Sequence, residues 1–156
     1  SGGGAGIQAD LKTCEANGVF GTTAIVALTA QNTLGVSGVE AVSPSFVRQQ
    51  IDAVLADIGA HVIKTGMLPT AEVIETVATA LNSHGASIRV IDPVFVAASG
   101  DQLVAEEAIE AMKTVLIPTA TVLTPNMPEA GALLGTPPPT TIEQMKEAAV
   151  ALLGLG

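Results

Sequence analysis

The chain has 156 residues, 48% of them hydrophobic and 13% charged, which is enough for one domain with a sizeable core and suits an α/β protein. A net charge of −9 and only 3 aromatic residues argue against nucleic-acid binding, since neither phosphate-neutralising charge nor a base-stacking surface is available. The single cysteine, Cys14, excludes an internal disulfide and a multi-cysteine zinc site, and it fits a reducing, cytoplasmic compartment. No apolar run is long enough to span a bilayer.

The chain opens on a glycine-rich segment, residues 1–10, with the composition of a loop between a strand and a helix. Closely spaced glycines let backbone N–H groups approach a ligand, and a helix is predicted to begin within the segment. In α/β folds such a loop follows a buried strand at the ligand-binding end of the sheet, and no strand precedes it here. We therefore expect a small-molecule site. We also expect a domain that is incomplete at both ends, because residues 154–156 resemble a helix stop that leads to a further strand.

Helix-like and strand-like stretches alternate along the rest of the chain. Apolar periodicity, capping residues and glycine stops predict helices over residues 5–17, 44–58, 70–84, 105–116, 128–134 and 142–153. Apolar and β-branched runs predict strands over residues 22–28, 39–42, 61–65, 88–91 and 121–123, with a polar loop over 29–38. Buried strands separated by helices form parallel sheets covered on both faces. We predict one α/β domain over residues 1–156, a three-layer αβα arrangement with a mostly parallel sheet.

Polar residues gather where the predicted strands end. In parallel sheets this edge faces the ligand, so residues from different strands meet there. The candidates are Asp10, Gln31, Asn32, Met67, Asp92, Val94, Asn126 and Glu129. Carboxylates beside a glycine-rich loop suit the binding of a Mg²⁺-nucleotide.

Several candidates have a purely structural interpretation that stays open at this point. Gln31 and Asn32 suit a turn, and Met67 suits a core position. Asp92 before a proline is a common turn opener. Asn126 and Glu129 match the first and fourth positions of a capping box, an interpretation that does not exclude ligand binding.

Other chemically capable residues favour structural roles. Cys14 shares a helical face with Ile7 and Leu11, which predicts a buried structural thiol. His84 is predicted in the last turn of a helix, where an imidazole suits the helix dipole. Lys64 falls within a predicted buried strand, so we expect it to be paired or to extend its ammonium to solvent. The phosphate-binding P-loop, the dinucleotide-binding glycine pattern, the zinc-binding helix and the nucleophile elbow are all absent from the sequence.

Five segments, in order along the chain, resemble successive signatures of the hydroxymethylpyrimidine/phosphomethylpyrimidine kinases of thiamine biosynthesis, which are members of the ribokinase-like superfamily. They are residues 1–13, 27–33, 64–68, 92–94 and 124–129. The resemblance runs from end to end and covers somewhat over half of a typical member. It implies γ-phosphoryl transfer from ATP to a hydroxymethylpyrimidine and then to its monophosphate.

The resemblance also implies site roles. Gln31 would recognise the aminopyrimidine edge, since a carboxamide presents a donor beside an acceptor. Met67 and Val94 would contact the ring, with Asp10 near the same pocket. The resemblance places three residues toward the nucleotide: Asp92, Asn126 and Glu129. The carboxylates of Asp92 and Glu129 would hold Mg²⁺ mostly through water.

The departures from the family concern both ends. The family's first strand, its later Lys-Gly-Gly segment and its Gly-Thr-Gly-Cys anion hole are absent from this sequence, and Cys14 is not the anion-hole cysteine. No catalytic residue is therefore assigned, and we expect residues 1–156 alone to be inactive.

Two alternatives remain open: a kinase of the same fold that acts on pyridoxal- or pyridoxine-type rings, and a ligand-binding module without turnover. Small-molecule partners are expected, with neither nucleic acid nor membrane. A homo-oligomer stays open.

Overall fold

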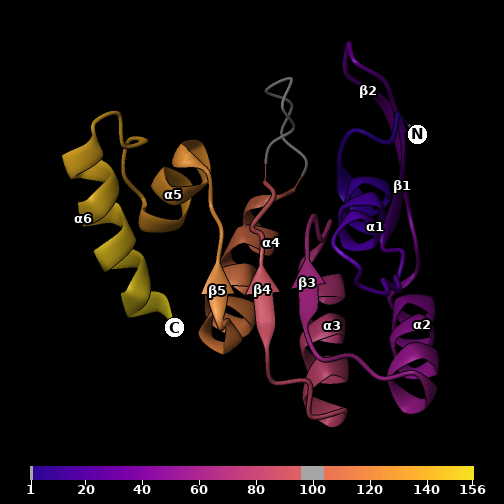
Figure 1. Cartoon of the computed structure of the whole chain (residues 1–156). Coiled ribbons are helices and arrows are strands. Elements are labelled where there is room, and N and C mark those ends of the chain that lie inside the picture. Colours follow the sequence, from indigo (N-terminus) through magenta and orange to yellow (C-terminus); the bar gives the residue numbers. More distant parts are fainter. Residues whose placement is uncertain (1, 96–103) are drawn as a thin grey trace.

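Three short parallel strands form the central sheet of the computed structural model, which describes residues 2–95 and 104–156 (Figure 1). They are β3 (Ile63–Thr65), β4 (Arg89–Ile91) and β5 (Val122–Leu123), in the spatial order β3-β4-β5. Lys64 lies opposite Val90, and Thr65 lies opposite Ile91. Because the strands run parallel, their carboxyl ends meet at one edge, as predicted for residues 61–65, 88–91 and 121–123.

Helices alternate with these strands, and each predicted helix is confirmed to within a few residues. They are α1 (Gly6–Ala16), α2 (Pro44–Asp57), α3 (Ala71–Ser83), α4 (Glu106–Ala111), α5 (Met127–Leu134) and α6 (Ile142–Leu152). The helix predicted over 105–116 changes to π-helical geometry over Met112–Leu116, and a 3₁₀ turn follows at Ile117–Thr119. A second 3₁₀ turn, Leu153–Leu155, extends α6.

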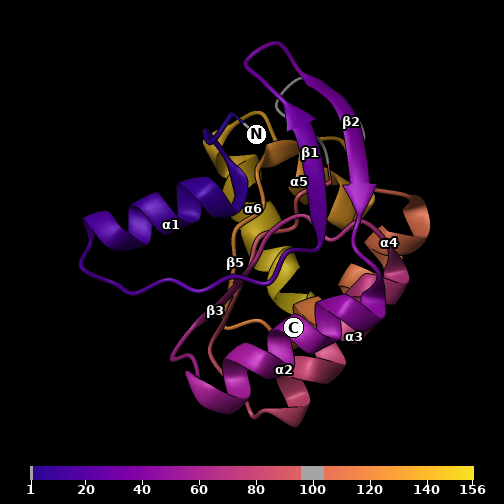
Figure 2. The same ribbon diagram turned by 90° about the vertical axis from the view of Figure 1, so that its right-hand side faces the viewer.

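The core lies between the sheet and the layer formed by α2, α3 and α4. Helix α3 contributes most to it, because Val73, Ile74, Val77 and Leu81 form one continuous buried stripe. The Thr70 hydroxyl accepts a hydrogen bond from the Val73 N–H at 3.2 Å and thereby caps the first turn. Figure 2 shows α1 on the opposite side of the sheet from α3 and α4, which gives the predicted three layers.

The strand predicted over residues 22–28 is wrong as a member of the parallel sheet. The observed strand, β1 (Ala27–Gln31), pairs antiparallel with β2 (Val36–Ala41) and forms a separate two-stranded sheet. Its residues alternate between intermediate burial and exposure, the pattern of a strand with one face in solvent.

The turn of this hairpin explains why the loop predicted over 29–38 is mostly strand. Asn32 Oδ1 accepts hydrogen bonds from the N–H groups of Leu34 at 2.8 Å and Gly35 at 3.3 Å. Gly35 has a φ of 155°, a conformation that L side chains rarely adopt. The turn interpretation of Asn32 is confirmed, and Gln31 is instead the last residue of β1.

Helix α1 departs from its predicted burial. None of its residues is buried, Ile7 and Leu11 are 38% and 37% exposed, and Cys14 is a partly exposed free thiol. The prediction of a buried structural cysteine is therefore wrong. The periodicity correctly gave one apolar face, but within the described residues no other helix or strand packs extensively against it.

Among residues 2–95 and 104–156, no helix combines the length and apolar character that a membrane crossing needs.

Candidate functional site

A lysine on β3 and an aspartate directly after β4 lie at the same edge of the sheet. Lys64 is the middle residue of β3, and Asp92 follows directly after β4. The Asp92 N–H donates to the Thr65 carbonyl at 3.2 Å, so the ladder continues one residue beyond β4 and fixes the backbone of Asp92 beside β3. The sheet itself therefore holds both residues in place.

The Lys64 ammonium lies between two aspartates that come from different parts of the chain. Lys64 Nζ donates to Asp10 Oδ1 at 3.0 Å and to Asp10 Oδ2 at 3.2 Å, and it lies 3.7 Å from Asp92 Oδ2. These side chains are 41%, 40% and 29% exposed in the order Lys64, Asp10, Asp92, so solvent reaches all three. We call this group the Asp10–Lys64–Asp92 cluster. The structure confirms that Lys64 is a paired lysine.

Asn126 and Glu129 form the complete capping box that the sequence left open as an interpretation. The Asn126 N–H donates to Glu129 Oε2 at 2.8 Å, and the Glu129 N–H donates to Asn126 Oδ1 at 2.9 Å. This arrangement satisfies two backbone donors at the start of α5 and fixes the Glu129 side chain.

The Glu129 carboxyl is almost fully buried, with 3% of the residue exposed. Burial raises the pKa of Glu129 above its ordinary value, and the negative charge of Asp92 raises this pKa further. Hydrogen bonds from Asn126 and from the Phe95 backbone oppose part of this rise. Asp92 therefore acts electrostatically on both Lys64 and Glu129, and the acidic side of the site extends from the Asp10–Lys64–Asp92 cluster to α5.

The residues expected to contact a pyrimidine come from three different segments of the chain. Gln31 ends β1, and a Cβ added to Gly2 would lie 3.5 Å from the Gln31 carbonyl oxygen, so the glycine-rich loop touches the end of the hairpin. Met67 is partly buried and packs against the core, and the Val94 N–H donates to the Asp92 carbonyl at 3.0 Å. A pocket shared by Gln31, Met67 and Val94 stays a prediction.

Metal binding by protein ligands alone is not supported in the described part of the chain. No three His, Cys, Asp or Glu side chains there are placed to hold an ion. Mg²⁺ does not need such a cage, because it usually keeps several waters and takes one or two carboxylates together with substrate phosphates. The donors at this edge, Asp92 and Glu129, fit that pattern, and burial together with the Asp92 charge raises the pKa of Glu129.

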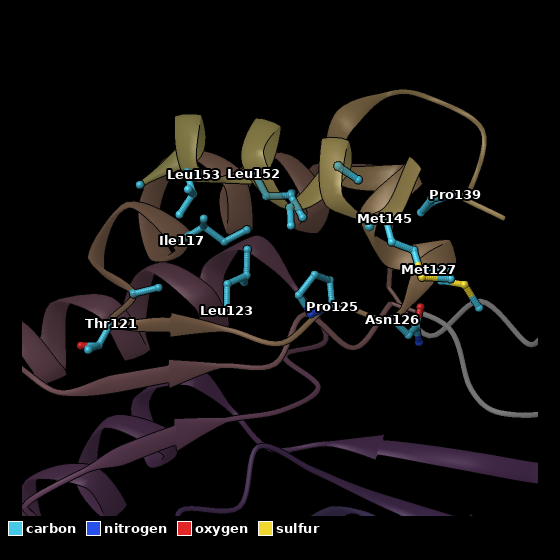
Figure 3. A pocket seen from close by; sticks show the side chains of 15 residues that line it. Ile117, Thr121, Leu123, Pro125, Asn126, Met127, Pro139, Met145, Leu152 and Leu153 are labelled. Carbon is cyan, nitrogen blue, oxygen red and sulfur yellow. The ribbon is translucent and has the colours of Figure 1, made fainter. Parts of the chain in front are cut away.

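An apolar groove of about 620 Å³ lies between β5, α5 and α6 (Figure 3). Its walls include Leu123, Pro125, Met145 and Leu152, and Asn126 lies at one end. Among the residues that the structure describes, the lining contains neither a charged side chain nor any member of the Asp10–Lys64–Asp92 cluster. The groove is therefore separate from the charged side chains at the sheet edge.

Two basic residues have clearer roles in the structure than in the sequence. Lys64 was expected either to be paired or to extend its ammonium to solvent, and its contact with both Asp10 and Asp92 was not predicted. The available signal was a charged residue inside an otherwise apolar strand. His84 caps the end of α3, as expected, and its Nε2 also lies 2.7 Å from Asp52 Oδ1 on α2. His84 therefore joins two helices at a distance from the site.

Comparison with known proteins gives one consistent family. The family described as phosphomethylpyrimidine kinase matches residues 1–156. The hydroxymethylpyrimidine/phosphomethylpyrimidine kinase of Bacillus subtilis is 46% identical over 156 residues, which are 100% of this chain and 57% of that protein.

Solved structures agree with this match. The crystal structure of phosphomethylpyrimidine kinase from Clostridium difficile superposes with a TM-score of 0.90 at 41% identity, covering 99% of this chain and 66% of that one. A pyridoxal kinase from Staphylococcus aureus, solved in complex with AMP-PCP and pyridoxal, superposes with a TM-score of 0.86 at 35% identity, covering 99% and 55%. The chain thus spans little more than half the length of the curated relative.

Proposed function

The chain belongs to the phosphomethylpyrimidine kinase family, and we propose that it provides the acceptor-binding loops and the acidic edge of an ATP-dependent kinase. The acceptor in this proposal is 4-amino-5-hydroxymethyl-2-methylpyrimidine and then its monophosphate, as part of thiamine biosynthesis. The observation that carries the proposal is the match of the kinase family to residues 1–156. It is supported by the convergence of Asp10, Lys64 and Asp92 at one edge of the sheet.

The nucleotide side of the proposed site is its acidic part. Asp92 and Glu129 would hold Mg²⁺ mostly through water, and Asn126 keeps the Glu129 carboxylate in one orientation. When bound, Mg²⁺ would offset the negative charge of the ATP phosphates. Asp92 follows a rigid strand, so its carboxylate is positioned before the ligand arrives, which limits the reorganisation that binding requires.

The acceptor side of the proposed site consists of the glycine-rich loop and the ends of β1, β3 and β4. The Gln31 carboxamide would pair with the ring nitrogen and the exocyclic amine of the pyrimidine. Met67 and Val94 would contact the ring faces, and Asp10 would lie near the hydroxymethyl group. In the first transfer, the hydroxymethyl oxygen forms a bond to the γ-phosphorus and releases its proton to water, the bond from that phosphorus to the bridging oxygen breaks, and ADP leaves. In the second transfer, a phosphate oxygen of the monophosphate forms the new bond, and ADP leaves in the same way.

Pyridoxal is the alternative acceptor, because pyridoxal kinases are among the structural neighbours. Both acceptors are substituted aromatic nitrogen heterocycles with a hydroxymethyl group, but the aminopyrimidine offers a donor beside an acceptor on one edge. A carboxamide at position 31 is therefore better matched to the pyrimidine.

The test is an acceptor competition with the protein that carries this sequence. ADP release is measured with the hydroxymethylpyrimidine, its monophosphate and pyridoxal, each alone and in pairs, and the products are identified by mass. We expect transfer to both pyrimidines with a higher kcat/KM than to pyridoxal. A higher kcat/KM for pyridoxal would favour the alternative, and binding of the pyrimidine without any transfer would overturn the kinase proposal.

A further inference from the structure

Helix α1 is held to the rest of the molecule by little apolar packing. None of its residues is buried, and among the described elements no helix or strand packs extensively on it. Figure 2 shows α1 projecting on one side of the sheet, with an extended connection to the following hairpin. The connecting segment lies against this helix at Gly21, close to Leu11 and Cys14, so the position of α1 relative to the sheet depends on such local contacts and on the polar contacts of its side chains.

Lys64 supplies such a contact across a sequence separation of 54 residues. Its ammonium reaches both carboxylate oxygens of Asp10, at 3.0 and 3.2 Å, so it fixes the direction of the Asp10 side chain as well as its distance. The base of this contact is rigid, since Lys64 sits in β3 between neighbours paired with β4, and the adjacent Thr65 is buried. The same ammonium lies 3.7 Å from Asp92 Oδ2. Its positive charge therefore reduces the repulsion between the carboxylates of Asp10 and Asp92.

Helix α1 in turn carries the glycine-rich loop. The Lys12 ammonium, on α1, donates to the Gly3 carbonyl at 3.1 Å. Gly2 lies against the Gln31 carbonyl, because a Cβ added to Gly2 would be in van der Waals contact with the Gln31 carbonyl oxygen. A continuous set of contacts thus runs from β3 through Asp10 and α1 to the glycine-rich loop and the end of β1.

We propose that Lys64 is a positioning residue that pins α1, and with it the glycine-rich loop, to the carboxyl edge of the sheet on the acceptor side of the site. The proposal that α1 is pinned stands on the contacts alone. Its consequence for the acceptor rests on the proposed kinase function. Without the ammonium, Asp10 and Asp92 are left as like charges at the same edge, and α1 loses a contact that opposes its displacement.

The test uses Lys64→Met in the protein that carries this sequence, with Lys64→Arg as the charge-conserving variant. Lys113→Met is the matched control, because Lys113 makes an ion pair of the same length, 3.0 Å, with Glu110 away from α1. Amide hydrogen exchange of α1 and α3 is followed by NMR, and KM for the pyrimidine and for ATP is measured on the same samples.

Lys64→Met should raise the exchange rates of the α1 amides by about fivefold, as expected for losing one partly exposed ion pair, with no change in α3. It should raise KM for the pyrimidine more than KM for ATP. Lys64→Arg should restore most of both effects, and Lys113→Met should show neither. Asp10→Asn should also accelerate exchange in α1, and the double variant should exchange no faster than Lys64→Met, because both changes remove one contact.

Unchanged α1 exchange in Lys64→Met, or additive effects of the two substitutions, would overturn the proposal. A general acceleration that includes α3 would also overturn it, since Lys64 would then support the whole fold. The exchange measurement needs no substrate. If the unmodified protein phosphorylates neither acceptor, the kinase proposal fails while the exchange data still decide whether Lys64 pins α1.

Discussion

Asn126 and Glu129 exchange two hydrogen bonds across the first turn of α5, one at 2.8 Å and one at 2.9 Å, so the carboxylate that we propose for the nucleotide side is also part of a helix cap. The two roles need different properties of the side chain. The cap needs an acceptor oxygen of the right length, whereas compensation of a bound cation needs negative charge. Substitutions that change one property at a time can therefore separate them.

Glu129→Gln is expected to weaken the use of ATP more than the binding of the pyrimidine. Glutamine keeps an oxygen that can accept from the Asn126 N–H, so the cap survives, but the charge near Asp92 is lost. KM for ATP and the Kd for the pyrimidine are measured together, with Glu147→Gln, at an exposed position on α6, as the control. Equal loss on both sides would assign Glu129 to the cap alone.

The same variant should change the pH dependence of stability in a defined direction. Burial raises the pKa of Glu129 above 4.5, so the folded state binds a proton more tightly than the unfolded state. The ionised carboxylate thus lowers stability as pH rises from 4.5 through the raised pKa, and a neutral glutamine removes this loss. Urea unfolding should show Glu129→Gln more stable than the unmodified protein at neutral pH and similar to it below pH 4.5. A variant that is less stable at neutral pH would contradict the assignment.

Gln31→Leu is expected to weaken binding of the hydroxymethylpyrimidine by about 1–3 kcal/mol, because leucine keeps much of the volume but leaves the polar edge of the ring unpaired. Calorimetric titration with the pyrimidine and with ATP gives the two affinities separately. Gln49→Leu, at an exposed position on α2, controls for the general effect of this substitution. Wild-type affinity in Gln31→Leu would remove Gln31 from the proposed pocket.

Asp52 links α2 and α3 through a network that should make stability depend on pH in the acidic range. Hydrogen bonds from Arg48 and His84 lower the pKa of Asp52, so its contribution is present above the ordinary pKa of 3.8 and is lost as pH falls through the lowered value. Asp52→Asn should reduce the urea midpoint at neutral pH, and the difference should shrink below pH 3.8. A constant difference across this range would show that the ion pairs are not the cause.

The sequence predicted the parallel part of the fold well, because its elements carry local signals. The helix predicted over residues 70–84 is present as α3, Ala71–Ser83, and Thr70 is its cap. The hairpin was missed because residues 22–28 are apolar enough to suggest a buried strand, while the turn depends on Asn32 and Gly35, whose signal is weaker. The burial of Cys14 was mispredicted because periodicity gives a face but not what covers it.

The site was predictable as a set of residues but not as an arrangement. Asp92, Asn126 and Glu129 were selected because they follow strands, and the structure does place Asp92 near enough to Glu129 to raise its pKa. The contact of Lys64 with Asp10 joins residues 54 positions apart, and no local pattern predicts it. The position of Lys64 in the sheet follows from the register of β3 with β4, and local sequence patterns do not specify this register.

The most direct test of the proposal is the effect of Asp92→Asn on phosphoryl transfer to the hydroxymethylpyrimidine, with pyrimidine affinity and urea unfolding measured on the same preparation. Asp92 is held at the sheet edge by its hydrogen bond to Thr65, and it lies 3.7 Å from the Lys64 ammonium. Its charge also raises the pKa of Glu129. Removal of its charge should lower kcat/KM for ATP by about a hundredfold, with pyrimidine Kd and the urea midpoint little changed. Asp57→Asn, exposed at the end of α2, should leave transfer unchanged. Transfer by Asp92→Asn at the rate of the unmodified protein would contradict the placement of the nucleotide at this edge.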